Sequence, residues 1–124
     1  MEVNYKRIND TDGELTLRFF DYKELMRFLE VTKCRSFVLA YHDENSPSDA
    51  VIAIYNRFEG RWYIKYRCVV SLDAELRRHF KRYGTLYLTQ KNTNHYLLEV
   101  LKSLKQMEVA RNLFLHIKKY LMQR

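Results

Sequence analysis

Two hydrophobic periods alternate along this chain, and their order restricts the fold more than any other feature of the sequence. A period of two residues, which is typical of β-strands, runs through residues 2–8 and 14–20. A helical period follows, because apolar side chains recur at spacings of three and four between Tyr22 and Leu29. The strand pattern returns at residues 34–42, so the sequence predicts that strands and helices combine in an α+β fold.

Turn and cap residues set the bounds of the remaining elements. Asp21, with Glu24 three residues later, is a capping-box variant that begins the first helix. Ser71 caps a second helix, which ends before Gly84. The other expected elements are strands at 50–57, 61–70 and 85–90 and a helix at 95–122. The predicted architecture is a single compact α+β domain over residues 1–124, in the order ββαβββαβα, with a mainly antiparallel sheet and a long C-terminal helix.

The register of the predicted hairpin over residues 50–70 decides which side chains share a face. A two-residue turn at Glu59-Gly60 would mix apolar and charged residues on both faces, whereas a three-residue loop over 58–60 separates them. We predict the three-residue loop. Its core face would carry Ile52, Ile54, Trp62, Ile64, Tyr66 and Cys68. Its polar face would carry Tyr55, Arg57, Arg61, Tyr63, Lys65 and Arg67.

Positive charge is in excess, with 22 Lys and Arg against 15 Asp and Glu and a net charge of +7. Nucleic-acid binding requires cations that neutralise phosphates and flat side chains on which bases stack, and the predicted polar face has both. A second cationic set lies along one side of the second helix: Arg77, Arg78, Lys81 and Arg82. We therefore predict a small, basic, non-enzymatic protein that binds nucleic acid or a nucleoprotein through these two sets. The alternative is that both are ordinary solvated faces.

The C-terminal helix does not keep a single apolar stripe. Its first half places one stripe on Leu97, Leu101, Leu104 and Met107. Its second half places another, rotated by roughly 130°, on Val109, Ala110, Leu113, Phe114, Ile117, Tyr120 and Leu121. Either the helix breaks near Met107, or its second half packs on the chain's own sheet or on a partner such as a second copy. The second functional hypothesis is therefore a protein-directed interaction module or inhibitor, for example a viral or mobile-element protein that blocks a nucleic-acid-handling host complex.

A small nuclease is the third functional hypothesis, and two candidate sites support it. The loop His42-Asp43-Glu44, with Asp49 after it, gathers an imidazole and carboxylates that could hold a divalent metal. Arg111 and His116 form an R-x4-H pattern, which resembles the catalytic motif of HEPN ribonucleases. The resemblance implies metal-independent RNA cleavage by these two residues. That family is an all-helical bundle, and the resemblance covers one helix of this chain.

Several other classes of protein are excluded by what the chain lacks. Its three glycines and one proline cannot be arranged into either of the common phosphate-binding glycine loops, and no cofactor is expected. Cys34 and Cys68 have no CxxC spacing for zinc or redox chemistry. The first residues show no signal-peptide pattern and the longest apolar runs have five residues, so we expect no membrane partner and a cytoplasmic location.

Overall fold

A single antiparallel sheet is the centre of this computed structural model, which describes the backbone of residues 1–122 and the side chains of residues 1–108. Within that range the sheet has seven strands, in the spatial order β1-β2-β7-β3-β4-β5-β6. The strands are β1 (Glu2–Arg7), β2 (Asp12–Phe19), β3 (Ser36–Tyr41), β4 (Ala50–Phe58), β5 (Arg61–Ile64), β6 (Arg67–Cys68) and β7 (Leu86–Thr93). The predicted α+β class with a mainly antiparallel sheet is confirmed.

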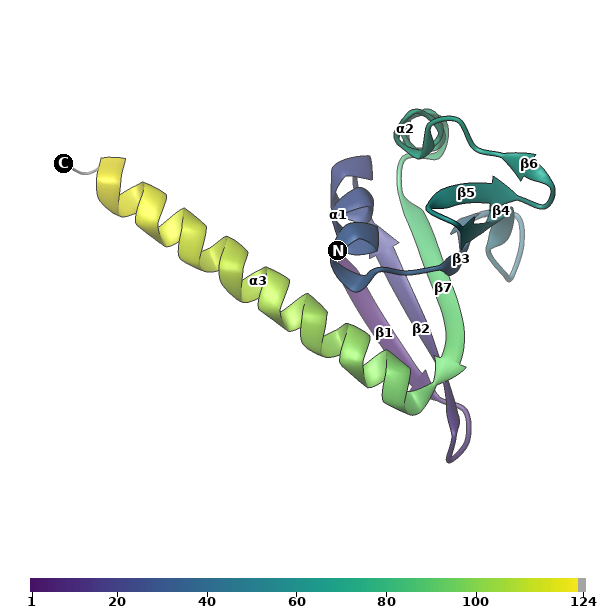
Figure 1. Cartoon of the computed structure of the whole chain (residues 1–124), viewed down its shortest axis with the longest axis horizontal. Coiled ribbons are helices and arrows are strands. Elements are labelled where there is room, and N and C mark those ends of the chain that lie inside the picture. Colours follow the sequence, from purple (N-terminus) through teal and green to yellow (C-terminus); the bar gives the residue numbers. More distant parts are fainter. Residues whose placement is uncertain (123–124) are drawn as a thin grey trace.

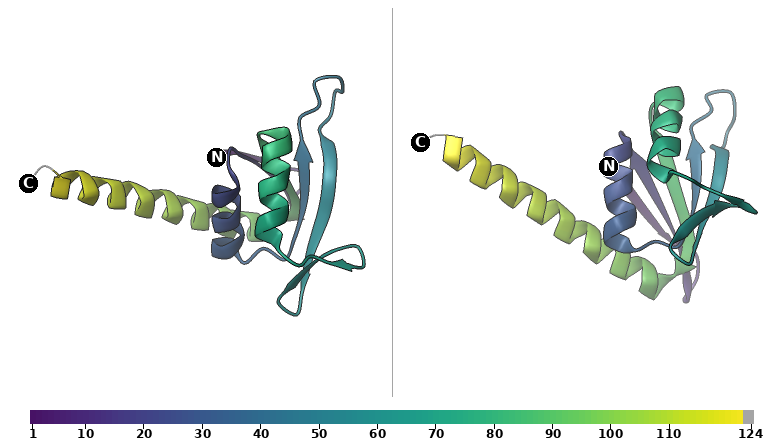
Figure 2. Two further views of the ribbon diagram at one scale, coloured as in Figure 1. Left: turned by 90° about the horizontal axis from the view of Figure 1, so that it is seen from above. Right: turned by 45° about the horizontal axis from the view of Figure 1, so that its top comes forward.

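Three helices accompany the sheet in the described residues: α1 (Tyr22–Thr32), α2 (Leu72–Tyr83) and α3 (Asn94–Met122). Figure 2 shows α1 and α2 side by side on the same face of the sheet. The opposite face carries no helix within the described residues (Figures 1 and 2). The apolar core therefore lies between the sheet and these two helices, where Leu17, Leu88, Phe28 and Leu76 are buried.

The cap residues define the helix ends as the sequence predicts. The Asp21 carboxylate accepts a hydrogen bond from the Glu24 backbone N–H at 2.9 Å, and the Ser71 hydroxyl accepts one from the Ala74 N–H at 3.2 Å. Gly84 follows α2 with a φ of 83°, a conformation that favours glycine. Local sequence signals are therefore sufficient to place both helices.

The predicted strand over residues 61–70 is wrong, because the chain turns back at Lys65-Tyr66 and makes two short strands. Ile64 pairs with Arg67 across this turn, and Lys65 has a φ of 52°. The observed order therefore contains one more strand than predicted. Tyr66, which the prediction placed on the core face, is fully exposed at this turn.

The predicted register of the β4–β5 hairpin is also wrong. Phe58 pairs with Arg61, so the turn consists of Glu59 and Gly60, both with positive φ. A two-residue turn of this kind matches the natural twist of paired strands. In this register Tyr55 pairs with Ile64 and lies on the helix-bearing face, where it is fully buried. The predicted polar face is therefore not a single surface.

The long helix α3 does not break near Met107, since its backbone is helical from Asn94 to Met122. Leu97 and Leu104 in its first half are buried in the core. Its second half extends away from the sheet and from α1 (Figures 1 and 2). The side chains of residues 109–124 lie outside the described part, and with them the predicted second stripe and the Arg111/His116 pair.

None of the helices in the described residues has a stretch apolar and long enough to cross a membrane.

Candidate nucleic-acid interface

The positive charge of the chain is concentrated between residues 57 and 82. This segment holds eight cations against three carboxylates, which is a net +5 of the chain's +7. The cations are Arg57, Arg61, Lys65, Arg67, Arg77, Arg78, Lys81 and Arg82, and the acids are Glu59, Asp73 and Glu75. The segment covers the β5–β6 hairpin and α2, and these lie next to each other in Figure 1.

The four cations predicted on the second helix are all exposed on α2, as expected. Two of them are held in place by neighbouring groups. The Arg77 guanidinium pairs with the Asp73 carboxylate at 3.1 Å and lies 4.7 Å from the centre of the Tyr22 ring in α1. The Arg82 guanidinium lies 5.3 Å from the centre of the Tyr83 ring. These contacts fix charged groups at the surface without removing them from water.

A buried carboxylate, Glu75, joins the two cationic sets that the sequence predicts separately. The Arg67 guanidinium donates to Glu75 Oε1 at 2.9 Å, and Arg78 Nη2 lies 3.9 Å from the same oxygen. Arg67 comes from β6 and Arg78 from α2, so one carboxylate holds cations from two elements. We call the resulting region the cationic surface, and it consists of Arg67, Arg77, Arg78, Lys81 and Arg82.

The other carboxylate oxygen of Glu75 accepts a hydrogen bond from the Tyr55 hydroxyl at 3.0 Å. His79 Nε2 lies 3.2 Å from the same hydroxyl. Because the phenol gives its only proton to Glu75, His79 must carry a hydrogen on Nε2 and donate it to the phenol oxygen. Tyr55, Glu75 and His79 are therefore joined by hydrogen bonds in one cluster beneath the cationic surface.

The pKa values in this cluster are shifted in directions that follow from its surroundings. Burial raises the pKa of Tyr55, and the negative charge and hydrogen bond of Glu75 raise it further. Burial lowers the pKa of His79, and the positive charge of Arg78 adds to the decrease. Both side chains are consequently neutral at pH 7, which suits a structural role better than a role in proton transfer.

Several residues of the predicted sheet interface lie elsewhere. Tyr55 is buried, so the prediction that it stacks on bases is wrong. The Arg57 guanidinium lies 6.0 Å from the centre of the Trp62 ring, on the helix-bearing side. The strand alternation puts Arg61 and Tyr63 on the opposite side of the sheet, and Lys65 lies in the turn. Of this set, Arg67 lies beside the α2 cations, because its guanidinium is hydrogen-bonded to Glu75.

The loop proposed for metal binding brings together only two of its four residues. His42 Nδ1 lies 3.3 Å from the Asp49 carboxylate, and both side chains are partly exposed. Among the residues whose side chains are described, no three His, Cys, Asp or Glu gather closely enough to hold a metal ion.

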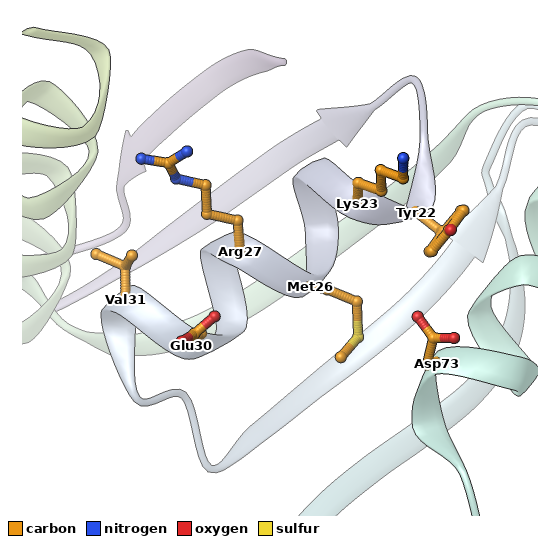
Figure 3. Close-up of a pocket in the computed structure, with 7 residues that line it drawn as sticks. All are labelled: Tyr22, Lys23, Met26, Arg27, Glu30, Val31 and Asp73. Atoms are coloured by element: carbon orange, nitrogen blue, oxygen red, sulfur yellow. The ribbon is translucent and has the colours of Figure 1, made fainter. Parts of the chain in front are cut away.

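A pocket beside α1 is drawn in Figure 3, and it borders the cationic surface because two of its lining residues, Tyr22 and Asp73, contact Arg77. Its lining residues are Tyr22, Lys23, Met26, Arg27, Glu30, Val31 and Asp73. Asp73 belongs to α2, and the other lining residues come from α1 (Figure 3). The lining mixes cations, carboxylates and apolar groups, a composition that indicates no particular ligand.

No protein-family model, curated protein or solved structure matches this chain.

Proposed function

We propose that this protein is a non-enzymatic binding protein that engages nucleic acid, free or in a nucleoprotein, through the cationic surface. The observation that carries the proposal is the junction at Glu75, where Arg67 of β6 and Arg78 of α2 meet. It makes one surface out of cations from separate elements. Contacts to phosphates give affinity without reading sequence, so no sequence specificity is proposed.

The fixed guanidinium groups favour this function. A flexible cation loses rotational freedom when it binds a phosphate, whereas one that is already positioned loses less. Arg67, Arg77 and Arg82 are each positioned by a carboxylate or an aromatic ring. Two carboxylates, Glu75 and Asp73, pair with cations among these five, so the surface keeps an excess of positive charge.

Titration of labelled single- and double-stranded DNA and RNA at several salt concentrations tests the proposal. If all five cations contact phosphates of a single strand, the affinity falls about tenfold for each doubling of salt, because each contact releases counterions. Undetectable binding, or binding that does not respond to salt, would contradict the proposal.

A protein-directed interaction module or inhibitor is the second candidate, and the uncovered face of the sheet favours it. Val51, Ile54 and Phe58 of β4 are each more than half exposed, and the strand alternation places them on that face. Exposed apolar groups on neighbouring positions are typical of interfaces between proteins. Capture of a specific protein partner from host extract, with no salt-sensitive nucleic-acid binding, would favour this candidate over the first.

We also propose that a second copy of the chain covers the second half of α3. This half extends away from the rest of the protein, and its sequence contains eight apolar residues between positions 109 and 121, seven of which form the predicted second stripe. A short helix without packing is only marginally stable in water, so a partner helix would stabilise it. Light scattering should give about twice the 15.2 kDa chain mass, and a monomer at all concentrations would contradict the contact.

A further inference from the structure

The turn between β5 and β6 presents an aromatic side chain to solvent. Tyr66 is fully exposed, and the pairing of Ile64 with Arg67 places it at the tip of the hairpin. In Figures 1 and 2 this hairpin projects from the edge of the sheet. Tyr66 therefore differs from the buried Tyr55, whose ring stacks on Phe37.

The residues of this turn are not those that stabilise a hairpin best. Two-residue hairpin turns with positive φ at the first position favour glycine there, and this turn has Lys65 with a φ of 52°. The exposed ring of Tyr66 gains no burial to offset its contact with water. Neither residue is therefore explained by the stability of the fold.

The surroundings of Tyr66 indicate what its ring could contact. Lys65 and Arg67 flank it in the chain, and Arg67 is held by Glu75 beside Arg78. The tip of the hairpin is thus linked directly to the cationic surface. A flat exposed ring beside fixed cations is the combination that binds a base and its adjoining phosphates.

We propose that Tyr66 stacks on an unpaired base, so that the preferred ligand of the cationic surface is single-stranded nucleic acid. This inference rests on the proposed function and narrows its ligand class. In a duplex the faces of the bases are already stacked on one another, and a ring can enter only by separating them at a cost. In a single strand a base face is available, while the neighbouring phosphates reach Lys65, Arg67 and the α2 cations.

Fluorescence anisotropy with a labelled single strand and the matched duplex tests this inference. The variants are Tyr66→Ala, which removes the ring, and Tyr66→Phe, which keeps it. Phe20→Ala is the matched control, because Phe20 is also exposed but directly follows β2, outside the cationic surface. We expect Tyr66→Ala to weaken single-strand binding about tenfold, with Tyr66→Phe and Phe20→Ala close to the wild type. The salt dependence should be unchanged in all three, because none removes a cation.

The outcomes separate this inference from the proposed function. Salt-sensitive binding that is equally strong for the wild type and Tyr66→Ala would overturn the role of Tyr66 and leave the proposed function intact. An equal loss on single strand and duplex would overturn the preference for an unpaired base. No binding by the wild type would overturn both. Since Tyr66 packs against nothing in the core, an unchanged melting temperature should show that Tyr66→Ala is folded.

Discussion

The Arg67 guanidinium donates to the Glu75 carboxylate at 2.9 Å and thereby connects a two-residue strand to the middle of a helix. The strand β6 is too short to be held by its own ladder, which consists of two residue pairs with β5. The Val69 N–H adds a bond to the Trp62 carbonyl at 2.8 Å. The Arg67–Glu75 pair is therefore a main reason why the tip of the hairpin has a defined position beside α2.

Replacing the Glu75 carboxylate should weaken both the fold and the position of the hairpin. Glu75→Gln keeps the shape of the side chain but removes the charge that Arg67 binds. It also leaves one side-chain oxygen to accept hydrogen bonds from both Arg67 and Tyr55. We expect a loss of about 1–3 kcal/mol in the free energy of unfolding, measured by urea denaturation. Asp73→Asn is the control, because Asp73 also pairs with an arginine of α2 but is more exposed. Equal stability of Glu75→Gln and the wild type would contradict a structural role for this carboxylate.

The Tyr55 ring and the Tyr55 hydroxyl should make separable contributions to stability. Tyr55→Phe keeps the stacking on Phe37 and removes the hydrogen bond to Glu75, so we expect a loss of about 1 kcal/mol. Tyr55→Ala also removes the ring from the core and should cost about 3–5 kcal/mol. A double-mutant cycle of Tyr55→Phe with Glu75→Gln measures the coupling, and additive losses would show that the bond contributes nothing.

Local sequence signals account for most of the helices and strands that are predicted correctly. The caps at Asp21 and Ser71 act on backbone groups three residues away, so their effect is visible in a short window. The register of the β4–β5 hairpin is different, because the partner that makes a buried Tyr55 acceptable is Glu75, twenty residues further along the chain. A rule that sorts apolar from polar residues therefore places Tyr55 on the wrong face.

The candidate interface was only partly predictable for the same reason. The four α2 cations follow from helical spacing alone, whereas the contact of Arg67 with α2 depends on Glu75. One signal was available, since Glu75 lies beside Leu72 and Leu76 on the apolar stripe and a buried acid needs a donor. The exposure of Tyr66 had no such signal, because its turn contains no Gly, Asn or Asp.

Acidification should destabilise the protein through His79. The pKa of His79 in the fold is lowered from its ordinary value of 6.5, mainly by burial and then by the charge of Arg78. The unfolded chain therefore binds more protons than the folded one just below pH 6.5, so stability falls as the pH decreases through that range. His79→Gln should show a smaller decrease in melting temperature between pH 7.5 and 5.5 than the wild type. The comparison variant is His42→Gln, which changes an exposed histidine, and a wild-type-like decrease in His79→Gln would refute the assignment.

A side chain at Gly13 should disturb the start of α3. A Cβ atom at this position would lie 2.5 Å from Asn94 Oδ1 and 3.0 Å from the Tyr5 ring. Asn94 would have to move, and its hydrogen bonds with the Tyr5 hydroxyl and the Asn9 carbonyl would weaken. We expect Gly13→Ala to lower the free energy of unfolding by about 1–3 kcal/mol. Gly60→Ala is a useful comparison, because its site is open but its φ of 76° strains alanine. If Gly13→Ala proves as stable as the wild type, the close packing of α3 on β2 is not rigid.

Neutralising cations on α2 should reduce both the affinity for nucleic acid and its dependence on salt. In the double variant Arg78→Gln/Arg82→Gln the surface loses two charges while Glu75 keeps Arg67 and Tyr55 as donors. For a single strand each lost phosphate contact lowers the slope of log affinity against log salt by about 0.7, so the expected decrease is about 1.4. Lys102→Gln/Lys105→Gln removes the same charge from exposed positions of α3 and should leave the slope close to that of the wild type. Equal decreases in the two double variants would mean that binding follows net charge alone, and the cationic surface would then have no special role.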